Sequence, residues 1–192
     1  MMRKLLPLLV LAAAMPAMQA CAPLAVGAAA GGAVLMIDDR RTAGVYIEDE
    51  NIEWKVLARV RELNTIAHVN ATSYNRKVLL TGEAPSEADK TRIAEAVAKV
   101  PSVREVINEM QLGGASSMAQ RGSDGLVTSN VKARMVNNGK VSTNHVKVVT
   151  EGGVVYLMGL VTQAEGDAAA EVARTTSGAT RVVKVFEYIG TK

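Results

Sequence analysis

Two stretches that lie 77 residues apart decide the fold: HVNATSYNRKVLLTGEA at residues 68–84 and HVKVVTEGGVVYLMGLV at residues 145–161. Five identities recur at this offset: His68/His145, Val69/Val146, Val78/Val155, Leu80/Leu157 and Gly82/Gly159. Further along, the stretch that begins at Ala94 aligns with the one that begins at Ala170, an offset of 76, so one residue is lost in between. Two copies indicate two similar modules, because a solenoid needs at least three repeats.

Each copy shows the same order of patterns. A stretch with apolar residues at helical spacing comes first, at 51–63 and again at 125–137. An alternating strand, a tight turn and a returning strand follow, and the glycine pair of EGGV suits the positive torsions of a hairpin. An alanine-rich helix and a last strand close the copy. The sequence therefore predicts an α+β protein of two αββαβ domains, 51–112 and 124–192, joined by a flexible linker at 113–123.

The first 20 residues read as an export signal. Arg3 and Lys4 form a basic start, an apolar run begins at Leu5, and small residues lead to Cys21, the single cysteine of the chain. The run is shorter than the roughly 20 residues that span a bilayer. Cys21 resembles the lipobox cysteine of bacterial lipoproteins, which is lipidated and becomes the mature N-terminus. Ordinary cleavage after Ala22 is the alternative.

Residues 21–50 are expected to be a tether and lead-in. The first half is rich in glycine and alanine, and the second half turns polar and acidic. We expect a largely irregular segment that ends at a helix capped by Asp49 or Asn51. Glu48, Asp49 and Glu50 are expected to be solvated.

Composition argues against several function classes. The chain has 22 basic and 19 acidic residues, and loss of Arg3 and Lys4 with the signal leaves 20 against 19. A near-neutral mature chain gives little support to nucleic-acid binding. No nucleophile elbow or phosphate loop is present. His68 and His145 each stand without nearby ligands in sequence, so a local hydrogen-bonding role is expected, with no metal, no cofactor and no catalytic residue.

The αββαβ order, with Gly82 and Gly159 ending the second strands, resembles the BON domain. An exported lipoprotein with two such domains is similar to the family of outer-membrane, phospholipid-binding BON lipoproteins involved in envelope integrity. The resemblance implies a protein anchored in the outer membrane through lipidated (palmitoylated) Cys21 and facing the periplasm. We expect both glycines to be structural, because a strand-end glycine permits a positive φ or a close backbone approach.

The candidate binding site is the helix that opens the second domain. The sequence predicts its N-terminus at Gly125, Leu126 and Val127, where backbone N–H groups would favour an anion. Asn130, Lys132 and Arg134 follow on the same helix. An exposed Leu126 beside basic residues would suit a lipid headgroup boundary. These six residues are predicted to bind anionic phospholipid.

Other interpretations of that helix stay open. Val127, Val131 and Met135 fall on one stripe typical of a core, and Lys132 and Arg134 are equally consistent with solvated charges. The competing function is a scaffold for envelope proteins, such as barrel-assembly or cell-wall partners. A monomer is expected in either case.

Domains of about 60 residues bury too little surface to be very stable alone. We therefore expect the two modules to pack on each other. Tyr46, Trp54 and Tyr74 are the candidates for that face, with Trp54 an equal candidate for the core.

Overall fold

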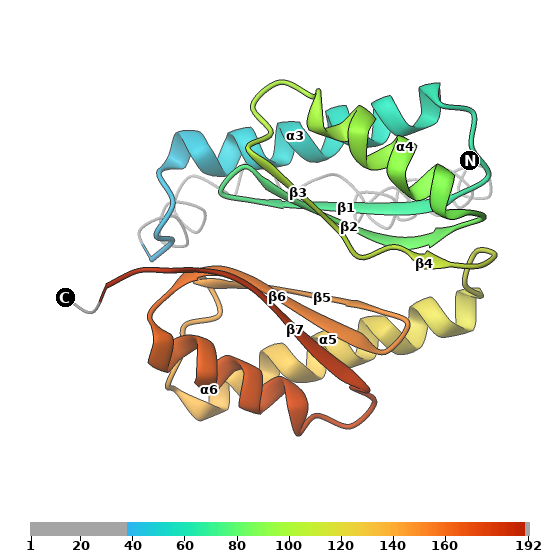
Figure 1. Cartoon of the computed structure of the whole chain (residues 1–192). Helices are drawn as coiled ribbons and strands as arrows, with labels where there is room; N and C mark the ends of the chain where they lie inside the picture. Colours follow the sequence, from blue (N-terminus) through green and yellow to red (C-terminus); the bar gives the residue numbers. More distant parts are fainter. Residues whose placement is uncertain (1–37, 191–192) are drawn as a thin grey trace, which may run out of the picture. The chain divides into compact units, whose positions relative to one another are not determined.

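The structure is a computed structural model that describes residues 38–190. The predicted signal, Cys21 and most of the tether lie outside the described residues. Within residues 38–190, four helices and seven strands follow one another in the order that the repeat predicts, apart from one additional short strand, β4 (Gln111–Leu112) (Figure 1). Among residues 38–190, no helix combines the length and the hydropathy needed to cross a membrane.

Module one (residues 43–112) contains two helices and a four-stranded sheet. Its elements are α3 (Ala43–Glu62), β1 (His68–Tyr74), β2 (Lys77–Ala84), α4 (Glu87–Ala98), β3 (Glu105–Asn108) and β4 (Gln111–Leu112). β2 is central: β1 pairs with it antiparallel, and β3 and β4 pair with it in parallel.

Module two (residues 118–188) repeats this plan with three strands. Its elements are α5 (Met118–Asn138), β5 (Val146–Glu151), β6 (Val154–Val161), α6 (Gln163–Arg174) and β7 (Arg181–Tyr188). β6 is central, antiparallel to β5 and parallel to β7. The predicted fold class of two αββαβ units with mixed sheets is confirmed. Module one departs in a detail, because the Asn108 side chain accepts a bond from the Met110 N–H and splits the last strand into β3 and β4.

Each module has its own core between its helices and one face of its sheet. Val78 and Leu80 of β2 lie in the first core, and Val155 and Leu157 of β6 lie in the second. Alternate residues of a strand point to opposite faces. Residues of the opposite faces form a third cluster shared by the modules: Tyr74, Leu79, Tyr156, Met158 and Val185. The expected packing of the modules is therefore present, with Tyr74 in the contact.

Trp54 lies neither in a core nor in this contact. Its side chain is 70% exposed, and Tyr46 is also exposed. Tyr46 instead faces the Arg41 guanidinium, which lies 4.8 Å from the centre of its ring. The predictions for these two aromatic residues are wrong.

Two segments predicted to be irregular are helical. α3 begins at Ala43, with Thr42 rather than Asp49 or Asn51 as its N-cap. α5 begins at Met118, where the Ser117 side chain accepts the Gln120 N–H. The lead-in at 43–50 and the linker at 118–123 are thus first turns of helices, because a capping hydroxyl satisfies orphan N–H groups even before a glycine-rich stretch.

Candidate functional site

α5 has one buried side and one exposed side. Its buried residues are Asp124, Val127, Val131 and Met135. On the opposite side, six exposed residues follow at steps of four, four, three, four and three: Met118, Gly122, Leu126, Ser129, Ala133 and Val136. We call these six the exposed stripe. It bears no charge, and Met118, Leu126 and Val136 are 78%, 68% and 65% exposed.

The charges beside the exposed stripe are positive. Lys132 and Arg134 of α5 are exposed, Arg121 is half-buried and lines a pocket with His68 and Glu151, and the one acidic residue, Asp124, is buried. Among the ion pairs found within residues 38–190, none involves these three cations. The exposed surface of α5 therefore combines apolar and cationic groups without a carboxylate.

The predicted site residues divide on this helix. Leu126, Asn130 and Lys132 are exposed, whereas Val127 belongs to the core. Gly125 lies in the interior of α5 and not at its N-terminus. The reasoning from an open helix N-terminus is therefore wrong, because the N–H groups of residues 125–127 lie inside the helical hydrogen-bond ladder, beyond the first four that are left free.

Arg134 is held in place rather than freely solvated. Its guanidinium donates to the Val172 carbonyl and to the hydroxyls of Thr175 and Thr176, at 3.2, 3.0 and 2.7 Å. These acceptors lie at the C-terminal end of α6, where a cation also interacts favourably with the helix dipole. All of them are neutral, so Arg134 keeps its net positive charge.

A buried aspartate on the first helix of each module was not identified from sequence. Asp49 accepts the N–H groups of Asn75 and Arg76 in the β1–β2 turn, both at 2.8 Å. Asp124 accepts those of Gly152 and Gly153 in the β5–β6 turn, at 3.0 and 2.9 Å. Asp49 is fully buried, so its expected solvated position is wrong.

The aspartates explain how the first hairpin turns without glycine. Asn75 and Arg76 have φ values of 52° and 63°, in a backbone region that residues other than glycine rarely adopt. The Asp49 carboxylate bonds both N–H groups and so holds this conformation. In module two, glycines occupy the equivalent positions.

Residues 38–41, directly before α3, fasten the chain to both modules. Arg40 forms two bonds of 2.7 Å to the Glu165 carboxylate of α6. Arg41 bonds Asp39 and Asp49 and lies 4.0 Å from the centre of the Tyr74 ring. The paired bonds from Arg40 lower the pKa of Glu165 to about 2, because they stabilise the ionised form.

Gly82 and Gly159 lie two residues before the ends of β2 and β6, so the prediction that they end these strands is wrong, but both have a steric reason. A Cβ on Gly82 would lie 2.1 Å from the His68 carbonyl oxygen, and one on Gly159 would lie 2.3 Å from that of His145. The neighbour is the antiparallel strand and not a helix. Gly82 also has a φ of 104°.

Both histidines make hydrogen-bond contacts, but the partners are distant in sequence and not local as expected. His145 Nε2 lies 2.7 Å from the Asp38 carbonyl oxygen. His68 Nδ1 lies 2.9 Å from Glu83, its cross-strand partner. Neither histidine has a potential ligand nearby in sequence, but the fold brings carboxylates to both. Glu83 lies 15 residues from His68, and the Asp38 and Glu165 carboxylates lie 3.6 and 3.8 Å from the ring nitrogens of His145.

Comparison with known proteins identifies both modules. The model of the BON domain matches residues 48–114 and 123–190. The chain is 40% identical over 178 residues to the outer membrane lipoprotein DolP of Haemophilus influenzae, covering 90% of each chain. It is 36% identical to a 21 kDa hemolysin of Actinobacillus pleuropneumoniae, covering 79% of each, and 29% identical to the osmotically-inducible protein Y of Escherichia coli, covering 70% of each.

Proposed function

The chain belongs to the BON-domain family, and on this premise we propose that it is a non-enzymatic lipoprotein of the outer membrane that binds anionic phospholipid through α5. The 40% identity to the outer membrane lipoprotein DolP supports an envelope location. The finer parts of the proposal are the lipidation of Cys21, the orientation toward the periplasm, the role in envelope integrity and the lipid itself.

One observation carries the lipid proposal: the exposed stripe of α5 is uncharged, and the flanking charges are all positive. A helix of this kind lies in the plane of a membrane interface, with its apolar side in the headgroup boundary and its cations toward anionic lipids. Exposed apolar side chains at Met118, Leu126 and Val136 contribute the apolar area. Each basic residue close to an anionic surface contributes about 1 kcal/mol.

This version of the site differs from the one predicted from sequence. It keeps Leu126, Asn130 and Lys132, and it adds Met118 and Val136 from the two ends of the helix. Val127 supports the helix from the core side and does not reach the surface. Gly125 lies beside the exposed stripe and contributes no free N–H group.

Vesicle co-sedimentation of residues 38–192 tests the proposal without the anchor. We expect binding to vesicles that contain phosphatidylglycerol and not to pure phosphatidylcholine, and weaker binding at high salt, because salt screens exposed charges. Replacing Met118, Leu126 and Val136 together by serine removes the apolar contact at exposed positions and should abolish binding while leaving the melting temperature nearly unchanged.

The matched control is the exposed apolar pair of α3, Ile47 and Trp54, replaced by serine. These variants should sediment like the unaltered protein. If the control variant loses binding and the α5 variant keeps it, the lipid site lies on module one and the proposal for α5 is wrong. If the unaltered protein binds neither vesicle, the lipid proposal fails, and α5 becomes a docking face for a protein of the envelope.

A further inference from the structure

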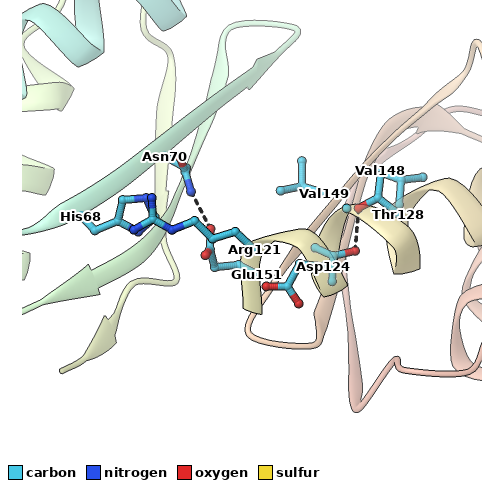
Figure 2. Close-up of a pocket in the computed structure, with 10 residues that line it drawn as sticks. His68, Asn70, Arg121, Asp124, Thr128, Val148, Val149 and Glu151 are labelled. Carbon is cyan, nitrogen blue, oxygen red and sulfur yellow. Dashed lines mark hydrogen bonds between the residues drawn. The ribbon is translucent and has the colours of Figure 1, made fainter. Parts of the chain in front are cut away.

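A group of metal-binding side chains gathers where the two modules meet. His68 of β1, Glu83 of β2 and Glu151 of β5 each present a ligand atom, and these atoms lie within 4.8 Å of one another. Figure 2 shows His68 and Asn70 from module one beside Glu151 from module two. The three residues lie far apart in sequence, and only the sheet register and the contact between modules bring them together.

Neighbouring groups hold the three ligands in place. Glu83 faces His68 across the β1–β2 ladder and accepts the Ser116 N–H at 3.1 Å. Glu151 accepts the Asn70 amide at 2.6 Å and the Thr81 hydroxyl at 3.2 Å. Hydrogen bonds of this kind orient carboxylates that bind metals.

No basic side chain within residues 38–190 forms an ion pair with the Glu151 carboxylate. Its side chain belongs to a residue that is 8% exposed, and its hydrogen-bond donors are neutral. Arg121 lines the same pocket but donates its Nε–H to Ser116. A buried carboxylate without a cation is costly, and a bound cation would remove that cost.

We propose that His68, Glu83 and Glu151 bind a divalent transition-metal ion, with Zn²⁺ as the best match. One imidazole nitrogen with two carboxylate oxygens is a set of ligands that zinc accepts, whereas Mg²⁺ and Ca²⁺ favour oxygen alone. Tetrahedral bonds of about 2.0–2.1 Å place ligand atoms roughly 3.3 Å apart. These atoms now lie within 4.8 Å of one another, so the three side chains must rotate closer together to reach that spacing.

The fourth position opens to water. A pocket of about 440 Å³ borders His68 and Glu151 and continues along α5 past Asp124 and Thr128 (Figure 2). A water molecule from this pocket completes the coordination. Because two ligands come from module one and one from module two, the ion links the modules and stabilises their contact.

The test is a titration of the full chain, purified in detergent and stripped with a chelator, with Zn²⁺ by isothermal titration calorimetry. We expect one equivalent to bind and the melting temperature to rise, since a ligand of the folded state stabilises it. His68→Gln and Glu151→Gln should each weaken binding at least tenfold. Glutamine at 151 keeps an oxygen for Asn70 and Thr81, so the metal-free variant should melt near the unaltered protein.

His145→Gln is the matched control, because it removes the histidine at the same repeat position outside the group and should bind Zn²⁺ normally. Glu83→Gln repeats the test if Glu151→Gln fails to fold. Absence of a saturable equivalent, unaltered affinity in the His68 and Glu151 variants, or stronger binding of Mg²⁺ than of Zn²⁺ would each overturn the proposal. Vesicle binding plays no part in these outcomes, so the two proposals fail separately.

Discussion

The first helices of the two modules, α3 and α5, correspond in their buried residues, but the two helices carry net charges of opposite sign. Four buried positions correspond at an offset of 75 residues: Asp49/Asp124, Ile52/Val127, Val56/Val131 and Val60/Met135. Yet α3 carries five acidic and three basic residues, which gives a net charge of −2. Helix α5 carries one acidic and three basic residues, which gives a net charge of +2. The repeat therefore preserves what each helix does for its fold, and the difference on the exposed side supports the proposal that α5, and not α3, binds lipid.

The acidic side of α3 makes it a poor partner for an anionic membrane. Its exposed apolar residues, Ile47 and Trp54, lie among Glu48, Glu50 and Glu53. Carboxylates near a negatively charged surface are repelled over about 8 Å at physiological salt. Exposed apolar area alone does not separate the helices; the sign of the surrounding charge does.

The largest expected effect concerns what the modules share. Gly82→Val and Gly159→Val should each lower the free energy of unfolding by about 4 kcal/mol or more, because the Cβ would collide with a backbone carbonyl. Gly82→Val should be the more severe, since Gly82 also has a positive φ. Urea denaturation followed by circular dichroism measures both.

Gly125→Ala is the control for these changes. A Cβ at Gly125 meets nothing within 4 Å, and alanine favours an interior helix position by about 1 kcal/mol. This variant should therefore be more stable than the unaltered protein. A loss of stability comparable to that of the Gly82 variant would contradict the steric account.

The next effect separates the two buried aspartates. Asp49→Ala should lower the free energy of unfolding by about 3 kcal/mol, because the turn loses its hydrogen-bond acceptors and Arg41 loses one buried carboxylate partner. Asp124→Ala should cost about 2 kcal/mol, since it removes hydrogen bonds to the turn and no ion pair. Thermal denaturation of both variants provides the comparison, and an equal loss would show that Arg41 adds nothing.

A smaller, pH-dependent effect concerns the contact of residues 38–41 with module two. Arg40→Ala should lower the free energy of unfolding by about 2 kcal/mol near neutral pH, as expected for the loss of paired charge-assisted hydrogen bonds. The pKa of Glu165 is lowered in the folded state, so its contribution is present above the ordinary value and is lost as the pH falls from about 4.5 toward 2. The melting curves of the variant and the unaltered protein should converge over that range; a constant difference would contradict the assignment.

The smallest effect concerns one exposed cation. Lys132→Gln should weaken binding to anionic vesicles about fivefold, corresponding to about 1 kcal/mol. Removal of an exposed lysine from α3, Lys55→Gln, should leave binding unchanged. Co-sedimentation at several lipid concentrations measures both affinities.

Sequence predicts the repeated part of this molecule well and the contacts between its parts poorly. The alternation of apolar residues and the turn residues predict both hairpins, because the two strands of a hairpin are neighbours in sequence. The helix starts were missed because glycine and serine in 113–125 resemble a linker, although Ser117 was available as a cap. The buried aspartates left a visible signal, since Asp49 and Asp124 recur before equivalent turns. Glu151 beside His68 left none, because their proximity depends on how the modules pack.

The most direct test of α5 as the lipid-binding helix uses the position of the single tryptophan. Trp54 lies exposed on α3, so its emission should stay constant when residues 38–192 are saturated with phosphatidylglycerol vesicles. A second protein that combines Trp54→Tyr with Leu126→Trp moves the fluorophore to the exposed stripe, and its emission should shift to the blue. A blue shift from Trp54, with none from the Leu126→Trp protein, would contradict the account.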